Sequence, residues 1–258
     1  MKVSLDLNLT ESEVKLEPEC VLFPSEERLD WRSVEEISTN ETACYYVEDH
    51  AARAIKGFSE FSGRVYGLMP TASAPTMLIS GIPMHRIKDT NPYQDTLNKI
   101  KAITPLKGEV LDTTTGLGYT AIEAAKTARH VVTVEIDPVA QEITRLNPWS
   151  RALFERPNIK QVIGDAFDEI EKLDPESFSV IIHDPPMFSL AGDLYSLAFY
   201  RQAFRVLKRN GKMFHYIGDP ESKSGARVTA GVIRRLQEAG FRRVARARRA
   251  FGVVAYKE

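Results

Sequence analysis

The sequence is poor in cysteine and has no long apolar run, and each absence narrows the classes of protein it can represent. Only Cys20 and Cys44 occur among 258 residues, which is too few for a disulfide framework and gives no ligand spacing for zinc. No run of about 18 apolar residues is present, so we expect no membrane-spanning helix. No apolar export signal occurs in the N-terminal stretch MKVSLDLNLTESEVKLEPEC, so we expect a cytoplasmic protein with reduced thiols.

The charges are balanced overall but unevenly distributed along the chain. Hydrophobic residues make up 43% and charged residues 27%, as in globular proteins, and the net charge is −1. Residues 1–60 contain six basic against fourteen acidic residues, whereas residues 220–258 contain ten basic against three acidic ones. This gradient can attract a polyanion to the C-terminal part, can hold the two ends together, or can be an ordinary solvated surface.

The pattern of apolar residues changes near residue 90. Before that point, short alternating runs predict mostly β structure, with one short helix following the acidic residue Asp30. We therefore predict a smaller, mostly β N-terminal accessory domain over residues 1–90. A larger domain is predicted over residues 91–258.

From residue 92 onward, patterns typical of helices and strands alternate. A helix is predicted over residues 92–103, and strand–helix pairs follow from Gly108. This alternation predicts an α/β fold with a Rossmann-like parallel sheet and helices on both faces. The final segment has no room for a crossover helix and can instead pair as an antiparallel hairpin: FRRVARARRAFGVVAYK.

The ends of the predicted strands carry the candidate cofactor-binding residues, because ligands of such sheets bind outside the carboxyl ends of the strands. The first strand ends in LDTTTGLGYTA, in which Asp112 and Thr114 are polar and Gly116 and Gly118 permit a sharp turn. Glu135 ends the second strand, about twenty residues after the glycines in the sequence. An acid at this position can bind both hydroxyls of a ribose.

The third strand end completes a site for an adenosine-type cofactor. Asp165 beside Ala166 can hydrogen-bond an adenine amino group, while Ile136 or Phe167 can pack on its face. Asp165 can equally cap the helix that begins near Ala166. A dinucleotide site usually has a third glycine, which is missing here, and Asp112 before the turn suits the amino group of a methionine tail better than a pyrophosphate. S-adenosylmethionine is therefore favoured over NAD.

The order VLDTTTGLGYTA, VVTVEIDP, VIGDAF, VIIHDPPMF resembles the Rossmann-like S-adenosylmethionine-dependent methyltransferases over roughly residues 92–258. The DPPMF segment is similar to the Asp/Asn-Pro-Pro-aromatic motif of amino-methyltransferases, including enzymes that methylate the N2 amine of a ribosomal-RNA guanine. More distantly, the chain resembles the spermidine-synthase group of aminopropyltransferases, which share the sheet and the VEIDP strand end.

The resemblance assigns catalytic roles to the segment after the fourth strand. The Asp184 carboxylate and the Pro185 carbonyl would accept hydrogen bonds from an acceptor amine and fix its direction. Pro185 and Pro186 would hold that carbonyl rigidly, and Phe188 would stack on a base. Met187 stands where the family has an aromatic residue. His183 is expected to pack in the core, and we expect no metal site.

The sequence indicates the cofactor more specifically than the molecule that accepts the methyl group. A basic region near the C-terminus favours RNA as the partner. We predict methylation of an amine nitrogen of structured RNA, either tRNA or rRNA. The alternatives are an aminopropyltransferase using the decarboxylated cofactor, for which Asp193 and Asp219 are the nearby additional acids, an N-methyltransferase of protein side chains, and a protein of this fold that binds a partner without turnover. The arginines of this region are Arg227, Arg234, Arg235, Arg242, Arg243, Arg246, Arg248 and Arg249.

Overall fold

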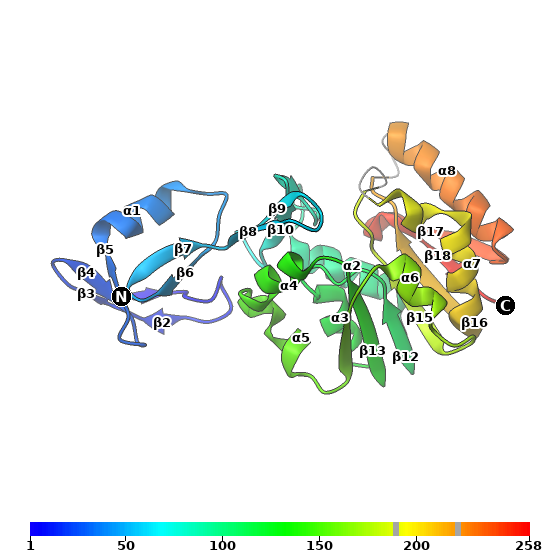
Figure 1. Cartoon of the computed structure of the whole chain (residues 1–258), viewed down its shortest axis with the longest axis horizontal. Coiled ribbons are helices and arrows are strands. Elements are labelled where there is room, and N and C mark those ends of the chain that lie inside the picture. Colours follow the sequence, from blue (N-terminus) through cyan, green and yellow to red (C-terminus); the bar gives the residue numbers. More distant parts are fainter. Residues whose placement is uncertain (188–190, 220–222) are drawn as a thin grey trace. The chain divides into compact units, whose positions relative to one another are not determined.

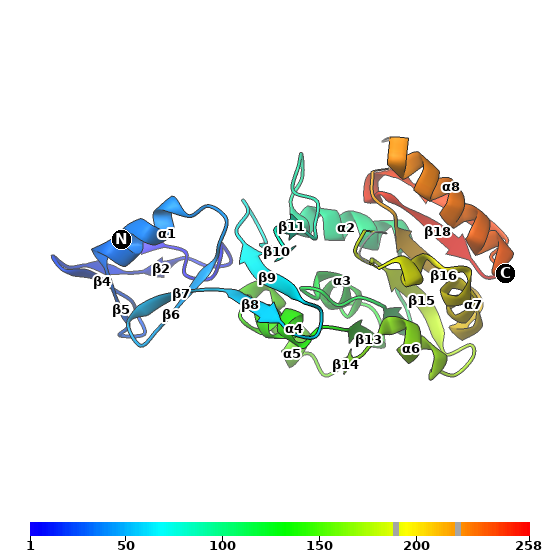
Figure 2. The same cartoon turned by 45° about the horizontal axis from the view of Figure 1, so that its top comes forward.

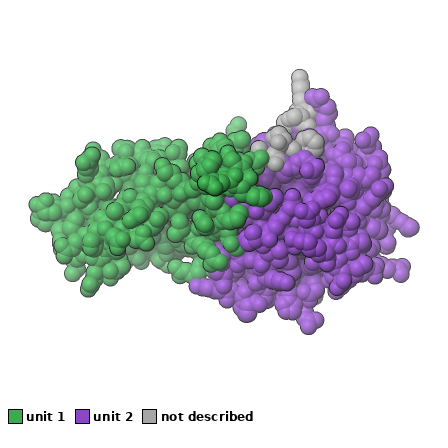
Figure 3. All heavy atoms as spheres, in the orientation of Figure 1, with its two compact units in different colours: residues 1–93, 138–151 green, residues 94–137, 152–258 purple. Residues whose placement is uncertain are grey.

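The computed structural model describes residues 1–187, 191–219 and 223–258. The chain divides into two compact units (Figure 3). The first contains residues 1–93 and 138–151, and the second contains residues 94–137 and 152–258. The first unit thus includes helix α4 (Pro138–Arg145) from the middle of the sequence. The boundary near residue 90 between two separate domains stays a prediction.

The first unit consists mainly of short antiparallel strands. Helix α1 (Trp31–Thr39) begins after Asp30, whose carboxylate accepts a hydrogen bond from the Ser33 N–H at 2.6 Å, so the acidic cap is confirmed. Strands β8 (Lys56–Ser59) and β9 (Arg64–Met69) form a hairpin (Figure 2). The other strands of this unit are β1 (Lys2–Val3), β2 (Ser12–Glu13), β3 (Lys15–Leu16), β4 (Cys20–Leu22), β5 (Arg28–Asp30), β6 (Tyr45–Glu48), β7 (Ala51–Ala54), β10 (Thr76–Ile79) and β11 (Ile82–Pro83).

A seven-stranded sheet forms the centre of the second unit (Figure 1). Its order is β14-β13-β12-β15-β16-β18-β17, and the first five strands are parallel. The last two form an antiparallel hairpin, as the short final segment predicted. The bounds are β12 (Glu109–Asp112), β13 (His130–Glu135), β14 (Ile159–Ile163), β15 (Phe178–His183), β16 (Leu207–Tyr216), β17 (Arg243–Ala247) and β18 (Gly252–Tyr256).

Helices cover both faces of this sheet, because successive side chains of a strand point to opposite sides. Ile181 packs in one core with helices α6, α7 and α8. Its neighbours Val180 and Ile182 pack in the other core, with helices α2, α3 and α5. The helices are α2 (Pro92–Ile103), α3 (Tyr119–Ala124), α5 (Arg151–Glu155), α6 (Ala166–Glu171), α7 (Leu197–Val206) and α8 (Lys223–Glu238), with 3-10 turns η2 (Gly192–Tyr195) and η3 (Arg248–Ala250). A further 3-10 turn, η1 (Pro148–Ser150), belongs to the first unit.

These features confirm the predicted α/β fold with a smaller, mostly β N-terminal region. The predicted helix over residues 92–103 has the bounds of α2. Helix α3 begins directly after the glycine turn and ends at Ala124. In the described part of the chain, none of the helices combines the length and apolar content needed to cross a membrane.

Candidate active site

The sequence-predicted acids follow four strands that run in the same direction. Asp112 ends β12 and Glu135 ends β13. Asp165 comes two residues after β14, and Asp184 directly follows β15. Because β14, β13, β12 and β15 are consecutive parallel neighbours, their carboxyl ends lie on one edge of the sheet. The structure therefore brings together the strand ends that the sequence singled out.

The glycine turn after β12 needs both of its glycines, for different reasons. Gly116 and Gly118 have left-handed φ angles of +51° and +74°. A methyl group on Gly116 would meet nothing within 4 Å, so this part of the turn borders open space. On Gly118 the same group would lie 2.7 Å from Cδ2 of Leu153. The first glycine leaves the turn accessible, and the second permits close packing at the start of α3.

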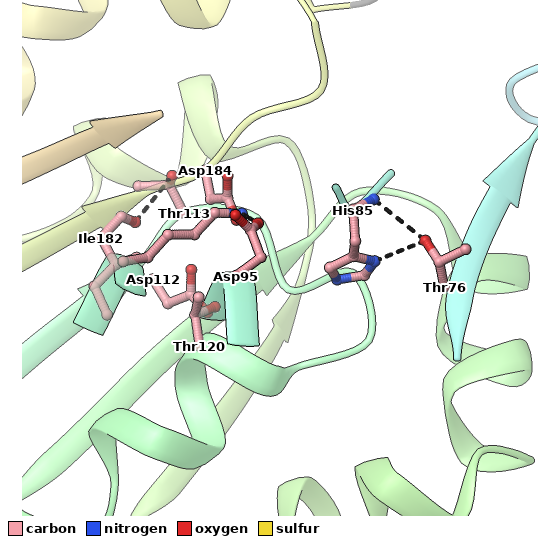
Figure 4. A network of polar contacts seen from close by, with 9 residues as sticks. Thr76, His85, Asp95, Asp112, Thr113, Thr120, Ile182 and Asp184 are labelled. Carbon is pink, nitrogen blue, oxygen red and sulfur yellow. Dashed lines mark hydrogen bonds and ion pairs between the residues drawn. The ribbon is translucent and has the colours of Figure 1, made fainter. Parts of the chain in front are cut away.

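Asp112 is a buried carboxyl group with one unsatisfied oxygen. Its Oδ2 accepts hydrogen bonds from the hydroxyls of Thr120 at 3.0 Å and Thr133 at 3.2 Å. Within the described ranges, Asp112 Oδ1 and the Thr114 hydroxyl are buried without a hydrogen-bond partner. Burial raises the pKa of Asp112 to about 8. Two polar groups beside the glycine turn are therefore available for hydrogen bonds with a ligand (Figure 4 shows Asp112 and Thr120).

Glu135 ties the end of β13 to the glycine turn. Its Oε2 accepts a hydrogen bond from the Gly116 N–H at 2.9 Å, and its Oε1 accepts one from the Asp137 N–H at 3.1 Å. Burial raises the pKa of Glu135 to about 7, against the opposing effect of these N–H groups. Each carboxylate oxygen has a second lone pair, so the fixed side chain can still accept two hydroxyl groups.

The remaining predicted cofactor residues lie around the end of β14 and the residue after β13. Asp165 caps α6, and its carboxylate accepts a hydrogen bond from the Phe167 N–H at 2.8 Å. The helix-capping alternative is therefore confirmed, and it does not exclude contact with a base. Ala166 is buried, while the Ile136 side chain is 42% exposed. Ile136 thus offers an accessible apolar surface.

The Asp-Pro-Pro segment is anchored at its second proline. The Tyr195 hydroxyl donates a hydrogen bond to the Pro186 carbonyl at 3.0 Å. Pro185 is buried, whereas Met187 is 49% exposed. Phe188, the predicted stacking residue, lies outside the described residues. The backbone after β15 is consequently held in place up to the residue before Met187.

The groups that surround the Asp184 carboxylate were not among the residues predicted from the sequence. Lys99 Nζ lies 2.7 Å from Asp184 Oδ2 and 2.9 Å from Asp95 Oδ2 (Figure 4 labels both acids). The Lys99 and Asp95 side chains are 2% and 0% exposed, and that of Asp184 is 18% exposed. The i,i+4 spacing of Asp95 and Lys99 on the predicted helix, in line with the apolar Ile103, was the available signal. Asp193 and Asp219, the acids that the sequence suggested, are both exposed.

The histidine of this segment is a core residue, as expected. His183 is fully buried, with Nδ1 2.6 Å from the Thr113 hydroxyl and Nε2 2.9 Å from the Leu194 carbonyl. Its ring stacks on Phe199, with centroids 4.7 Å apart. Burial lowers the pKa of His183 to about 3, so the ring is neutral. In the three described stretches, no group of three His, Cys, Asp or Glu side chains could hold a metal ion.

The C-terminal arginines lie mainly on the surface of α8 and the final hairpin. Arg235 is the exception, because it is partly buried and donates from Nε to the Tyr195 carbonyl at 2.9 Å. Arg243 stacks over the Tyr256 ring at 3.7 Å. The exposed members are Arg227, Arg234, Arg242, Arg243, Arg246, Arg248 and Arg249.

Comparisons with known proteins agree with this fold. A family model described as the methyltransferase small domain matches residues 95–221. The uncharacterized protein MJ1233 of Methanocaldococcus jannaschii is 45% identical over 261 residues, covering 99% of this chain and 88% of that protein.

Several solved structures share the fold at low sequence identity. Spermidine synthase in complex with the transition state analogue AdoDATO has a TM-score of 0.64 and 18% identity, over 87% of this chain and 85% of that one. Spermidine synthase from Thermotoga maritima has a TM-score of 0.62 and 17% identity, over 88% and 84%. MNMC2 from Aquifex aeolicus has a TM-score of 0.57 and 20% identity, over 77% and 72%. The family match shows that residues 95–221 belong to the S-adenosylmethionine-dependent methyltransferase family, and the solved structures share the Rossmann-like fold.

Proposed function

We propose that this protein methylates an amine nitrogen of structured RNA, in tRNA or rRNA. The observation that carries the proposal is the environment of Asp184. Its carboxylate is partly accessible, one of its oxygens is fixed by Lys99, and the prolines that follow it are anchored through Tyr195. Such a group can orient a neutral N–H donor at the edge where the family's cofactor binds.

The residues of the glycine turn fit S-adenosylmethionine, the cofactor of this family. Asp112 Oδ1 and the Thr114 hydroxyl, both unsatisfied among the described residues, would receive the amino group of its methionine tail. Glu135 would accept the ribose hydroxyls, and Asp165, Ala166 and Ile136 would surround the adenine. Gly116 leaves the space that such a ligand requires. When bound, the cofactor supplies a methyl group activated by its sulfonium.

The acceptor amine would be oriented by Asp184 and Pro185. An exocyclic amine of a base is neutral and donates its lone pair into the ring, so it is a weak nucleophile. Hydrogen bonds from its two N–H groups to Asp184 Oδ1 and the Pro185 carbonyl would direct the lone pair away from the protein backbone. Fixing both acceptors in advance avoids reorganising them during the reaction. Phe188 remains the proposed stacking residue.

RNA is favoured as the acceptor by the exposed arginines of α8, β17 and η3, together with Arg242 just before β17. Seven exposed guanidinium groups lie within residues 227–249, and none of them is needed for the cofactor roles assigned above. Guanidinium groups bind phosphate through two parallel hydrogen bonds, which makes such a surface suitable for a nucleic-acid backbone. The overall charge of −1 restricts this attraction to one part of the molecule.

An aminopropyltransferase is the second candidate, because the likeness to spermidine synthase extends over 87% of the chain, further than the methyltransferase family match. Two features favour methyl transfer. Asp112 has an unsatisfied oxygen suited to an amino-acid tail. In addition, the carboxylate that would have to bind a cationic amine, Asp184, already holds a lysine ammonium.

The test is transfer of labelled methyl from S-adenosylmethionine to RNA from a strain that lacks the gene, in which the target site is unmodified. We expect label in the RNA fraction, its loss after ribonuclease treatment, and at least a hundredfold slower transfer with Asp184→Ala. Label in protein instead of RNA would overturn the proposed acceptor. Wild-type rates with Asp184→Ala would overturn the role of this residue, and aminopropyl transfer from the decarboxylated cofactor would establish the second candidate.

A further inference from the structure

Lys99 forms a buried ion cluster with the acceptor-site carboxylate. Its Nζ contacts Asp184 on one side and Asp95 on the other, at 2.7 and 2.9 Å. The ammonium also lies 4.5 Å from the centroid of the Tyr216 ring, within range of a cation–π contact. The ammonium thus has three partners, and removing it would leave the buried Asp95 and the mostly buried Asp184 without a counter-charge.

The charge on Lys99 is permanent under ordinary conditions. Burial alone lowers the pKa of Lys99, but the carboxylates of Asp184 and Asp95 outweigh burial and raise it. For the same reason a neutral Lys99 would leave the buried Asp95 and the mostly buried Asp184 without a counter-charge, which is strongly unfavourable. Any ligand that approaches Asp184 consequently meets a fixed positive charge directly behind it.

This charge discriminates between two kinds of amine. A base amine is uncharged and needs only a hydrogen-bond acceptor, which Asp184 Oδ1 provides. An alkylamine such as a polyamine is protonated near neutral pH and needs an unpaired carboxylate. At hydrogen-bonding distance from Asp184, an alkylammonium would stand within a few ångströms of the Lys99 ammonium. In this poorly solvated region the repulsion by Lys99 is weakly screened and offsets the attraction of Asp184, while the buried Asp95 already pairs with Lys99.

We propose that Lys99 is the specificity-determining residue of the acceptor site: it fixes the Asp184 carboxylate and restricts the site to neutral planar amines, excluding alkylammonium ions. This inference rests on the proposed function, which places the acceptor amine at Asp184. Lys99 acts through Asp184 and is a positioning residue. A lysine that served only to stabilise the fold would have no effect on which amine binds.

The experiment measures binding of 1,4-diaminobutane and spermidine by calorimetry. Lys99→Met removes the charge and retains much of the side-chain volume, and Lys99→Met/Asp95→Asn also removes the second acid, in case the single variant folds poorly. Lys99→Arg retains the charge. The matched control is Lys101→Met, which changes an exposed lysine of the same helix. Thermal unfolding identifies the variants that fold.

We expect no measurable polyamine binding by the wild type, Lys99→Arg or Lys101→Met, and binding at least tenfold tighter than the detection limit by a folded Lys99→Met protein. Adding Asp184→Asn should abolish that gain. Polyamine binding by the wild type, or no gain in either folded charge-removing variant, would overturn the proposal. If RNA methylation is absent while the gain is observed, the proposed acceptor fails and the role of Lys99 stands. If RNA is methylated and no gain is observed, the proposed acceptor stands and the role of Lys99 fails.

Discussion

The Tyr195 hydroxyl donates a hydrogen bond to the Pro186 carbonyl at 3.0 Å, and the Tyr195 side chain is only 2% exposed. This contact joins the turn η2 to the Asp-Pro-Pro segment. Pro186 contributes a carbonyl but no N–H, so the backbone there offers an acceptor and no donor. The tyrosine therefore holds the segment that carries the proposed acceptor groups.

Replacing Tyr195 with Phe removes this hydrogen bond and leaves the ring in place. We expect a loss of about 1 to 2 kcal/mol in the free energy of unfolding, because the Pro186 carbonyl loses a partner. Methyl transfer should slow at least tenfold, while affinity for S-adenosylmethionine should stay unchanged. Denaturant unfolding, calorimetry and the RNA assay measure the three quantities. Equal losses in cofactor affinity and transfer would contradict a role confined to the acceptor segment.

The two glycines of the turn should respond differently to alanine. Gly118→Ala adds a methyl group 2.7 Å from Leu153 in a left-handed conformation, so we expect a loss of about 2 to 4 kcal/mol in stability. Gly116→Ala has the same unfavourable φ sign but open space around the added group, so the loss should be about 1 to 2 kcal/mol.

Cofactor affinity separates the two glycines further. The methyl of Gly116→Ala would enter the space that the ligand is proposed to occupy, and binding of S-adenosylmethionine should weaken at least tenfold. Gly116→Ala serves as the matched comparison for Gly118→Ala, measured by denaturant unfolding and calorimetry. Full cofactor affinity in Gly116→Ala would place the ligand elsewhere.

The sequence predicted the features that depend on neighbouring residues. Asp30 and Asp165 cap helices through N–H groups two or three positions away, and the final hairpin follows from the short distance between its strands. The strand ends were identified because strand direction alone places them on one edge of the sheet. Such features are local or follow from chain direction, so composition and spacing are sufficient.

The interactions around the acceptor site could not be predicted in the same way. Lys99 and Asp184 are 85 positions apart, and they meet only because α2 packs in the same core as β15. The spacing of Asp95 and Lys99 indicated a charged pair on a buried helix face, but the strand that would receive it was unknown. The contact of Tyr195 with Pro186 depends on a 3-10 turn that no residue pattern indicated.

Stability should depend on pH through Asp112. Its pKa is raised from 3.8 to about 8, so the folded protein binds the proton more tightly than the unfolded chain. The corresponding stability is fully present below about pH 4 and is lost as pH rises to about 8. Asp112→Asn should remove this dependence, and the difference between variant and wild type should change by roughly 1 kcal/mol per pH unit between pH 5 and 8.

Denaturant unfolding of both proteins at several pH values measures the difference directly. Calorimetry supplies a second readout, because S-adenosylmethionine should bind with release of a proton if its amino group pairs with ionised Asp112. Methylthioadenosine, which lacks the amino-acid tail, is the control ligand. Parallel pH profiles for Asp112→Asn and the wild type would show that this carboxyl does not carry the titration.

Charge reversal on the final hairpin tests the proposed RNA contact. Arg242 and Arg246 are exposed, and neither forms part of the proposed cofactor or acceptor site. Arg242→Glu/Arg246→Glu should weaken RNA binding at least tenfold at low salt and reduce its salt dependence, because about two phosphate contacts are lost. Lys101→Glu, an exposed reversal on α2, is the control, and affinity for S-adenosylmethionine should be unchanged in both. Lys101→Glu makes half the charge change of the double variant. If the position of the charge matters as well as the net charge, its loss of RNA affinity should be well below half that of the double variant. Equal weakening per charge in both variants would mean that RNA senses only the overall charge, and the hairpin would then have no special role in binding.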